Sequence, residues 1–197
     1  MDQPLGMYIG NSLEVMEAME VLKGNVKGDL LEVSLLLGAH MLLLAGRVQT
    51  EAEGKALLQQ QIDNGAGIAK FRELLIQQGG NPAIIEQPDF LPLSPCSLEV
   101  KAEKSGYLTH MDTAKIGRAS QETGAGRAFK EQPLDFGAGI ITKKRLGDYV
   151  EAGEVLAVIY SATDKACASA AEIFQSALTI SAEKAPLPPL VLNIISA

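Results

Sequence analysis

Apolar side chains recur every three or four residues near the amino end of the chain, after an opening loop rich in proline and glycine. Val15, Ala18, Met19 and Leu22 fall on one face of a helix at this spacing. Asn11 followed by Glu14 has the spacing of a capping box, which predicts that the helix begins there. The glycine at position 24 predicts its end.

Three further helical stretches follow. The second begins at Asp29 and is apolar nearly all round, so we predict that it lies buried at the centre of a helical layer. The third is capped by Thr50 with Glu53, and a fourth around Phe71 ends at two glycines. Residues 12–79 are therefore predicted to form a helical layer. Prolines at positions 82, 88, 92 and 95 then predict an irregular linker without a regular element.

The pattern changes to short runs of β-branched and aromatic residues between positions 104 and 161. The runs at 106–110, 139–142 and 155–160 are separated by glycine-bearing turns, which predicts a compact β unit. Val150, Val155, Ala157 and Ile159 can line one face of it. Helical spacing returns over residues 164–178, and residues 190–195 are predicted to close the chain as a strand. The fold class predicted is α/β (α+β).

Composition and charge exclude several classes of partner. The chain has 197 residues, 47% of them apolar, with 17 basic and 24 acidic side chains and a formal charge of −7. This charge repels nucleic acid and anionic membranes. The longest apolar run, residues 35–46, is well short of the roughly 20 residues that span a bilayer. With no secretory signal visible, we expect a cytoplasmic protein.

The residues that could carry chemistry are few and scattered. Cys96 and Cys167 match no CxxC spacing and are interpreted as free, reduced, structural thiols. Only two histidines are present. Of these, His40 lies in an apolar run without a second polar group, so we interpret it as a core or half-exposed residue and not as a catalytic one. Glu14 and Glu17 could share a cation, although such helical pairs usually face solvent.

Two segments resemble ligand or cofactor sites without meeting their requirements. The segment TDKA around Lys165 resembles a lipoyl-attachment site, but the helical pattern that follows offers no returning strand, so a helix amino terminus near Asp164 is favoured. The segment ETGAGRAFK could cradle phosphate beside Arg127 and Lys130. It lacks the GxxxxGK[ST] spacing and opens no visible helix, so a turn between strands is favoured.

Several motifs in order resemble the carboxy-terminal half of the pyrimidine nucleoside phosphorylase family, which includes thymidine phosphorylase. They are QPLGMYIGNSLEVMEAMEVLKG at 3–24, LLGAHMLLLAG at 36–46, KSGYLTHMDTAKIG at 104–117, GAGRAFKEQPLDFGAGI at 124–140 and LGDYVEAGEVLAVIYS at 146–161. The last also resembles the hairpin of biotinyl/lipoyl barrel-sandwich domains. The resemblance implies a helical part plus linker over residues 1–95 and an α/β-hammerhead (barrel-sandwich hybrid) module over residues 96–197.

The family resemblance also implies a reaction. Phosphate, the co-substrate, attacks the anomeric carbon of a pyrimidine nucleoside and gives the free base and a pentose 1-phosphate. The family residues that hold phosphate and base come from the amino-terminal half, and the Lys-x-Ser and GGT-containing motifs are absent here. We therefore expect part of a homodimeric enzyme that is inactive as an isolated chain. The preference for thymidine or uridine stays open.

One family site can be carried over by motif position. Many bacterial members bind a monovalent cation, potassium, through two backbone carbonyls and one carboxylate, which here would be Leu5, Tyr8 and Glu17. For Glu17, an ordinary first-turn carboxylate favoured by the helix dipole is the alternative. For the whole chain, the alternatives are a lipoyl-like carrier modified at Lys165, or an interaction domain that pairs with a separately encoded amino-terminal half.

Overall fold

A computed structural model describes residues 2–195. The chain forms two compact units. The first unit comprises Met1–Val15 with Leu91–Pro188, and the second comprises Met16–Phe90 with Pro189–Ala197. The division into domains 1–95 and 96–197 stays a prediction.

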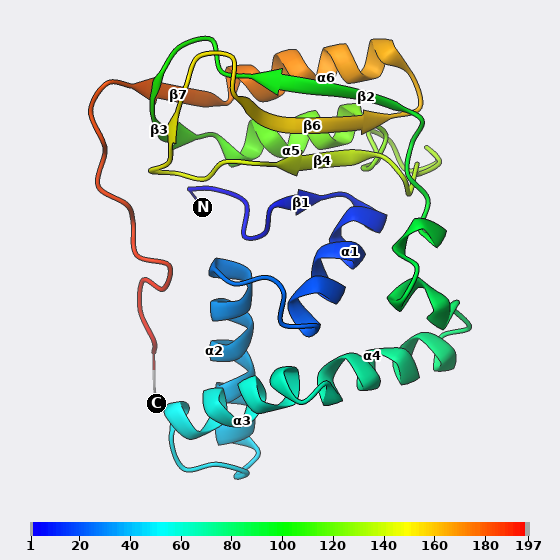
Figure 1. Ribbon diagram of the computed structural model, residues 1–197, viewed down its shortest axis with the longest axis vertical. Helices are drawn as coiled ribbons and strands as arrows, with labels where there is room; N and C mark the ends of the chain where they lie inside the picture. Colours follow the sequence, from blue (N-terminus) through cyan, green and yellow to red (C-terminus); the bar gives the residue numbers. More distant parts are fainter. Residues whose placement is uncertain (1, 196–197) are drawn as a thin grey trace. The chain divides into compact units, whose positions relative to one another are not determined.

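A short strand and a run of helices come first along the sequence, and strands interrupted by two helices follow (Figure 1). The α-helices are α1 (Asn11–Leu22), α2 (Asp29–Leu44), α3 (Glu51–Asp63), α4 (Ala66–Gln77), α5 (Thr113–Glu122) and α6 (Asp164–Ser176). Two 3-10 helices are η1 (Pro82–Ile85) and η2 (Pro88–Phe90). The strands are β1 (Tyr8–Ile9), β2 (Cys96–Lys101), β3 (Gly106–Met111), β4 (Gly139–Thr142), β5 (Tyr149–Val150), β6 (Val155–Ser161) and β7 (Leu178–Ser181). This confirms a mixed α and β fold.

The first unit is built on two antiparallel sheets. The larger has the strand order β1-β4-β6-β2, and the smaller has the order β5-β3-β7. Helices α5 and α6 pack against each other and against the larger sheet, as Figure 1 shows. Between them lies the apolar core, whose largest fully buried side chains include Phe174, Leu108, Ile140 and Ile159.

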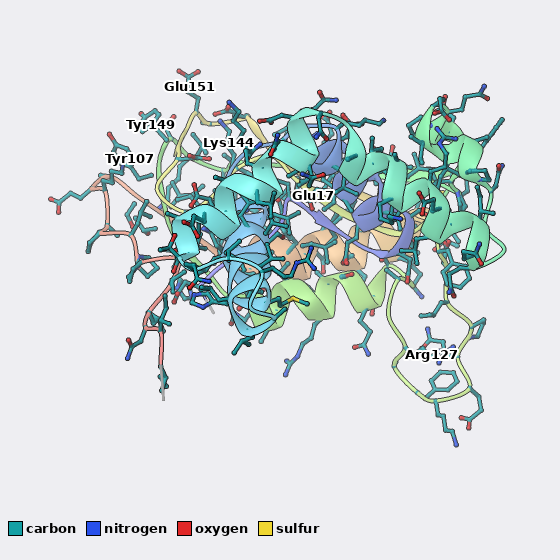
Figure 2. The ribbon with its side chains drawn as sticks, turned by 90° about the horizontal axis from the view of Figure 1, so that it is seen from below. Glu17, Tyr107, Arg127, Lys144, Tyr149 and Glu151 are labelled. Carbon is teal, nitrogen blue, oxygen red and sulfur yellow. The ribbon has the colours of Figure 1, made fainter. Side chains whose placement is uncertain are left out.

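The hairpin predicted from GDYVEAGEVLAVI is not formed, because β5 pairs with β3 in the smaller sheet while β6 pairs with β2 and β4 in the larger one. The predicted glycine turns are present, and Gly147 and Gly153 adopt φ values of 88° and 85°, which favour glycine. Val150, Ala157 and Ile159 are fully buried as predicted, whereas Val155 is only partly buried. An edge-to-face pair joins β3 to β5, since the Tyr107 and Tyr149 rings lie 5.1 Å apart at 74° (Figure 2).

Four elements of the first unit were not predicted as such, the first of them the short strand β1 in the segment predicted as a loop. Helix α5 stands inside the segment that the sequence pattern assigned to strands, and strands β2 and β7 flank the unit. The Asp112 side chain caps α5 by accepting a hydrogen bond from Lys115 N–H at 3.1 Å. Helix α6 confirms the predicted helix and its start near Asp164. The Thr163 side chain caps it by accepting a hydrogen bond from Ala166 N–H.

The start of α1 differs in detail from the predicted capping box. Glu14 N–H donates to the Gly10 carbonyl and the Glu14 carboxylate accepts from Gly10 N–H at 3.1 Å, so the reciprocal pair is formed by Gly10 and Glu14. The Asn11 amide instead donates to the Ala125 carbonyl at 3.1 Å. The helix was predicted correctly, but its cap was placed one residue too late.

The second unit holds the predicted helices α2, α3 and α4. The capping box of α3 is confirmed, with Thr50 Oγ1 accepting from Glu53 N–H at 3.1 Å. The predicted burial of α2 is wrong. Only Ala39 of this helix is buried, while Leu37, Met41 and Leu44 are 60%, 70% and 90% exposed. Within residues 2–195, no helix combines the length and apolar character that crossing a membrane requires.

Two further expectations are corrected. The segment from 81 to 95 contains two short 3-10 helices, the first capped by the Asn81 side chain, which accepts from Ala83 N–H. The strand predicted for residues 190–195 is not formed, and Leu192 and Ile195 are 85% and 92% exposed. The β-branched composition of this segment alone cannot make a strand without a partner strand.

Candidate functional site

The segment that precedes α1 carries the family motif and is fixed on the first unit by hydrogen bonds. Thr142 donates to the Met7 carbonyl through both its N–H at 2.8 Å and its hydroxyl at 3.0 Å. The Arg145 guanidinium donates to the Pro4 carbonyl at 3.1 Å, and Leu146 N–H donates to the Gln3 side chain at 3.0 Å. Residues 142–146 therefore form a clamp that holds the backbone of residues 3–8.

Strand register sets the direction of the Tyr8 carbonyl. Tyr8 lies opposite Ile141 and Ile9 lies opposite Ile140 in the β1–β4 pair. Backbone groups alternate in direction along an antiparallel pair. Because the Met7 carbonyl faces β4, where it accepts from Thr142, the Tyr8 carbonyl points away from β4. A main-chain oxygen at this position can be directed at a ligand whatever the side chain is.

The turn from β1 into α1 depends on close backbone packing. Gly10 has a φ of 142°, and a Cβ there would lie 2.5 Å from the Ala138 carbonyl oxygen. Ser12 N–H donates to the Phe136 carbonyl at 3.0 Å. The first turn of α1 is thereby attached to the loop that precedes β4.

Glu17 is the one buried carboxylate among the described residues, with 5% of its surface exposed. A buried carboxylate is costly unless hydrogen bonds or a cation compensate its charge. Tyr8 and Leu5 belong to the first unit and Glu17 to the second, so the cation site of Leu5, Tyr8 and Glu17 stays a prediction. The oxygen donors it would use are of the type that hard cations prefer. Residues 2–195 contain no group of three or more His, Cys, Asp and Glu side chains that could hold a metal ion.

Lys165 does not stand at the tip of a hairpin. It lies in the first turn of α6 and is exposed, two residues after the capping residue Thr163. A carrier lysine needs a tight turn between two strands, and β6 is followed here by a helix. The position offers no support for a carried prosthetic group.

The glycine-rich segment at 124–126 connects α5 to β4, so the predicted turn between strands is in fact a turn after a helix. Arg127, on the projecting loop of Figure 2, donates through Nε to the Gln132 carbonyl at 3.0 Å. Ala128 N–H donates to the Gln132 side chain at 2.7 Å. Both donors form hydrogen bonds with Gln132 of the same loop. This arrangement does not favour a phosphate-binding site.

His40 does have a polar neighbour, contrary to the sequence-based expectation. Its Nε2 lies 3.3 Å from a carboxylate oxygen of Glu51 in α3, although the geometry is not that of a hydrogen bond. The Lys55 ammonium, 2.6 Å from Glu51, is the main cause that lowers the pKa of that carboxyl. The side chains of His40 and Glu51 are each 35% exposed, and the cluster links α2 to α3.

Comparison with known proteins matches part of the first unit to a described domain. The family model named "Pyrimidine nucleoside phosphorylase C-terminal domain" matches residues 107–181. The pyrimidine-nucleoside phosphorylase of Staphylococcus aureus strain bovine RF122 / ET3-1 is 45% identical over 161 residues, which is 82% of this chain and 37% of the relative. The chain belongs to the pyrimidine nucleoside phosphorylase family. The protein of strain USA300 has the same identity and coverage.

The matches to pyrimidine nucleoside phosphorylases cover only part of the relatives and a defined set of elements in this chain. The chain spans little more than a third of the length of these relatives, 37%. The matched domain begins within β3 and ends with β7, so it includes α5, α6 and strands β4 to β6. The clamp at residues 142–146 could not be recognised from the sequence, because its hydrogen bonds join positions about 140 residues apart, as for Leu146 and Gln3.

Proposed function

We propose that this chain supplies the carboxy-terminal part of a pentosyltransferase that cleaves pyrimidine nucleosides with phosphate. The products are the free base and a pentose 1-phosphate. The observation that carries the proposal is the 45% identity over 161 residues to pyrimidine-nucleoside phosphorylases of S. aureus. The cytoplasm is the location that we propose for this reaction.

The role proposed for the chain is that of a scaffold. The residues that hold phosphate and nucleoside are expected in the part of the relatives that the match does not cover, which is the larger part of their length. We accordingly propose that the isolated chain does not catalyse phosphorolysis. Supporting this role, the Arg127 donor is engaged within its own loop and Lys165 lies exposed at a helix start.

The partner that we propose is the amino-terminal part of the same enzyme. The exposed side chains Leu37, Met41 and Leu44 are spaced as one stripe on α2. An apolar stripe of this kind favours contact with another apolar surface. We propose that the amino-terminal part covers it and that the whole enzyme is a homodimer.

A potassium ion is the cofactor that we propose for the amino-terminal segment. Glu17 would provide the negative charge, and the main-chain carbonyls of Leu5 and Tyr8 would provide further oxygens. The buried position of Glu17 and the direction of the Tyr8 carbonyl support this assignment. The cation would neutralise the carboxylate and brace the start of α1.

We further propose that the first unit is an α/β-hammerhead related to barrel-sandwich domains. The two antiparallel sheets and the turns at Gly147 and Gly153 support this. The competing lipoyl-like carrier is not favoured, because Lys165 begins a helix. Intact mass distinguishes the two, since a carrier would gain the mass of its prosthetic group.

A chimeric enzyme tests the proposed function. The matched 161-residue segment of the S. aureus relative would be replaced by the corresponding residues of this chain. Release of uracil or thymine from uridine or thymidine with phosphate would be measured. We expect turnover by the chimera and none by this chain alone or by the relative without the segment.

Two results would contradict the proposed function. One is a chimera that folds and assembles like the relative yet releases no base, and the other is turnover by the isolated chain at enzyme-like rates. In the same chimera, Glu17→Gln should raise the potassium concentration needed for half-maximal activity. Glu20→Gln, on the same helix and paired with Lys23, should not. Equal potassium dependence in both variants would contradict the cation site.

A further inference from the structure

The two cysteines, 71 positions apart in sequence, meet on the helix-covered face of the larger sheet. Cys96 begins β2 and lies opposite Ser161, the last residue of β6. Directly opposed residues of an antiparallel pair project to the same face. The Ser161 hydroxyl donates to the Thr123 carbonyl at 2.8 Å, immediately after α5, so this face is the one under the helices. Both cysteines accordingly belong to the apolar cluster of the first unit.

Cys167 approaches Cys96 from α6. Its sulfur lies 3.6 Å from the Cys96 carbonyl oxygen, to which the thiol donates, and 3.8 Å from that of Ile159. The Cys96 thiol donates to the Ala162 carbonyl at 3.6 Å, next to the start of α6. Cys167 is 2% exposed, whereas Cys96 is only partly buried. An oxidant can therefore reach Cys96 first.

The surroundings hold both thiols in their protonated form at neutral pH. Burial raises the pKa of Cys96, and the Asp164 carboxylate adds to that effect. Burial likewise raises the pKa of Cys167, with Cys96 as the next cause. Each sulfur thus lies within electrostatic range of the other. The resting state is a reduced pair that reacts slowly, because the thiolate is the nucleophile.

We propose that Cys96 and Cys167 form an oxidative modification site in which a peroxide converts the pair to a reversible intrachain disulfide. The Cys96 thiolate attacks one oxygen of hydrogen peroxide, the O–O bond breaks, and Cys96 becomes a sulfenic acid while hydroxide leaves and is protonated. The Cys167 thiolate then attacks the Cys96 sulfur, forming the S–S bond and expelling hydroxide, which is protonated to water. Overall, two thiols and one peroxide give one disulfide and two waters.

The disulfide ties the beginning of β2 to the second turn of α6. It links positions 71 apart in sequence, so the closed loop contains β3, α5 and strands β4 to β6. Such a constraint reduces the freedom of the unfolded chain, more strongly for long loops. We therefore expect the oxidised protein to melt several degrees higher than the reduced protein, and a dithiol reductant to reverse the shift.

The experiment treats the full chain with hydrogen peroxide under conditions where circular dichroism shows it folded. Thiols are then alkylated with a maleimide in denaturant and counted by intact mass. Of the two free thiols per chain, we expect none to remain. Digestion should release a peptide pair joined through Cys96 and Cys167. The rate should rise with pH up to the raised pKa of Cys96.

Two single variants test the order of the steps. Cys167→Ala removes the second thiol, so Cys96 should accumulate as a sulfenic acid that dimedone traps. Cys96→Ala should leave Cys167 available for alkylation after the same peroxide dose, because Cys167 is buried. Three results would overturn the proposal: two alkylatable thiols after oxidation, a disulfide only between chains, or dimedone labelling of the unsubstituted protein equal to that of Cys167→Ala.

Discussion

Gly10 and Gly139 bring their backbones into direct contact where β1 meets β4. A Cβ atom on either residue would lie 3.1 Å from the Cα of the other, and their φ values are 142° and 151°. This approach joins the family motif before α1 to the sheet of the first unit. A residue with a side chain at position 10 or 139 would therefore have to displace the facing backbone. Backbone moves less easily than the end of a side chain.

Gly139→Ala should lower the free energy of unfolding by about 2–4 kcal/mol, since it combines a backbone collision with an unfavourable φ. Urea unfolding followed by circular dichroism measures the change. Gly117→Ala is the matched control, because an added Cβ there meets nothing within 4 Å. Alanine in that helical position should stabilise by up to about 1 kcal/mol. Similar losses in both variants would refute the importance of the close approach.

Phe174→Ala tests where the core lies. Phe174 is 1% exposed in α6, in the apolar cluster shared by both sheets and both helices of the first unit. Removal of a buried phenyl ring should cost about 3–5 kcal/mol in unfolding free energy. Phe129→Ala, at a side chain 62% exposed, should change it by less than about 0.5 kcal/mol. A loss below 1 kcal/mol for Phe174→Ala would place the core elsewhere.

Local patterns predicted the elements whose determinants are close in sequence. The turns at Gly147 and Gly153 follow from the local sequence, and the cap of α3 follows from Thr50 and Glu53 alone. The pairing of β5 with β3 instead of β6 was not predicted, because it joins strands that are distant in sequence. Helix α5 was missed because only one of its buried residues, Ile116, is large and apolar, while Ala119 and Ser120 are small. These residues have helical spacing, but the nearby glycines favoured an interpretation as turns. The exposure of α2 was missed because apolar composition does not say which surface is available to cover it.

Contacts between distant positions could not be predicted in the same way. The proximity of His40 to Glu51 depends on how α2 turns into α3, and the meeting of Cys96 with Cys167 depends on α6 returning over β2. The hydrogen bond from Arg145 to the Pro4 carbonyl joins the loop between β4 and β5 to a segment 141 positions earlier in the sequence. Of the candidate site, the sequence therefore indicated the motif residues but not the residues that hold them.

Thr50→Ala should weaken the start of α3. The Thr50 hydroxyl accepts from Glu53 N–H at 3.1 Å, and the Glu53 carboxylate accepts from Thr50 N–H at 3.2 Å and from Gln49 N–H at 2.8 Å. Loss of an N-cap costs about 1 kcal/mol. Amide hydrogen exchange should accelerate in the first turns of α3, about fivefold for that energy. Thr50→Ser retains the acceptor and should exchange like the unsubstituted chain; acceleration in both variants would argue against the cap.

The pH dependence of stability should depend measurably on Glu154. Its carboxylate lies 2.5 Å from the ammonium of Lys144, which Figure 2 labels together with Glu151 of the β5–β6 turn. That hydrogen bond, followed by one from Glu151 N–H at 2.9 Å, lowers the pKa of Glu154. A lowered folded-state pKa means stability that is fully present above the unfolded value, about 4.3, and is lost as the pH falls through the folded value.

Glu154→Gln should therefore lower the melting temperature at pH 7, and the difference from the unsubstituted chain should shrink as the pH approaches 3. The groups are exposed to solvent, so 1 M salt should also reduce the difference, because the Debye length is then only about 3 Å. Glu131→Gln, at an exposed carboxylate on the 124–136 loop, is the control and should show no such trend. A melting difference for Glu154→Gln that is as large at pH 3 as at pH 7 would show that its charge does not stabilise the fold, since a protonated carboxyl and an amide then differ little in their interaction with Lys144.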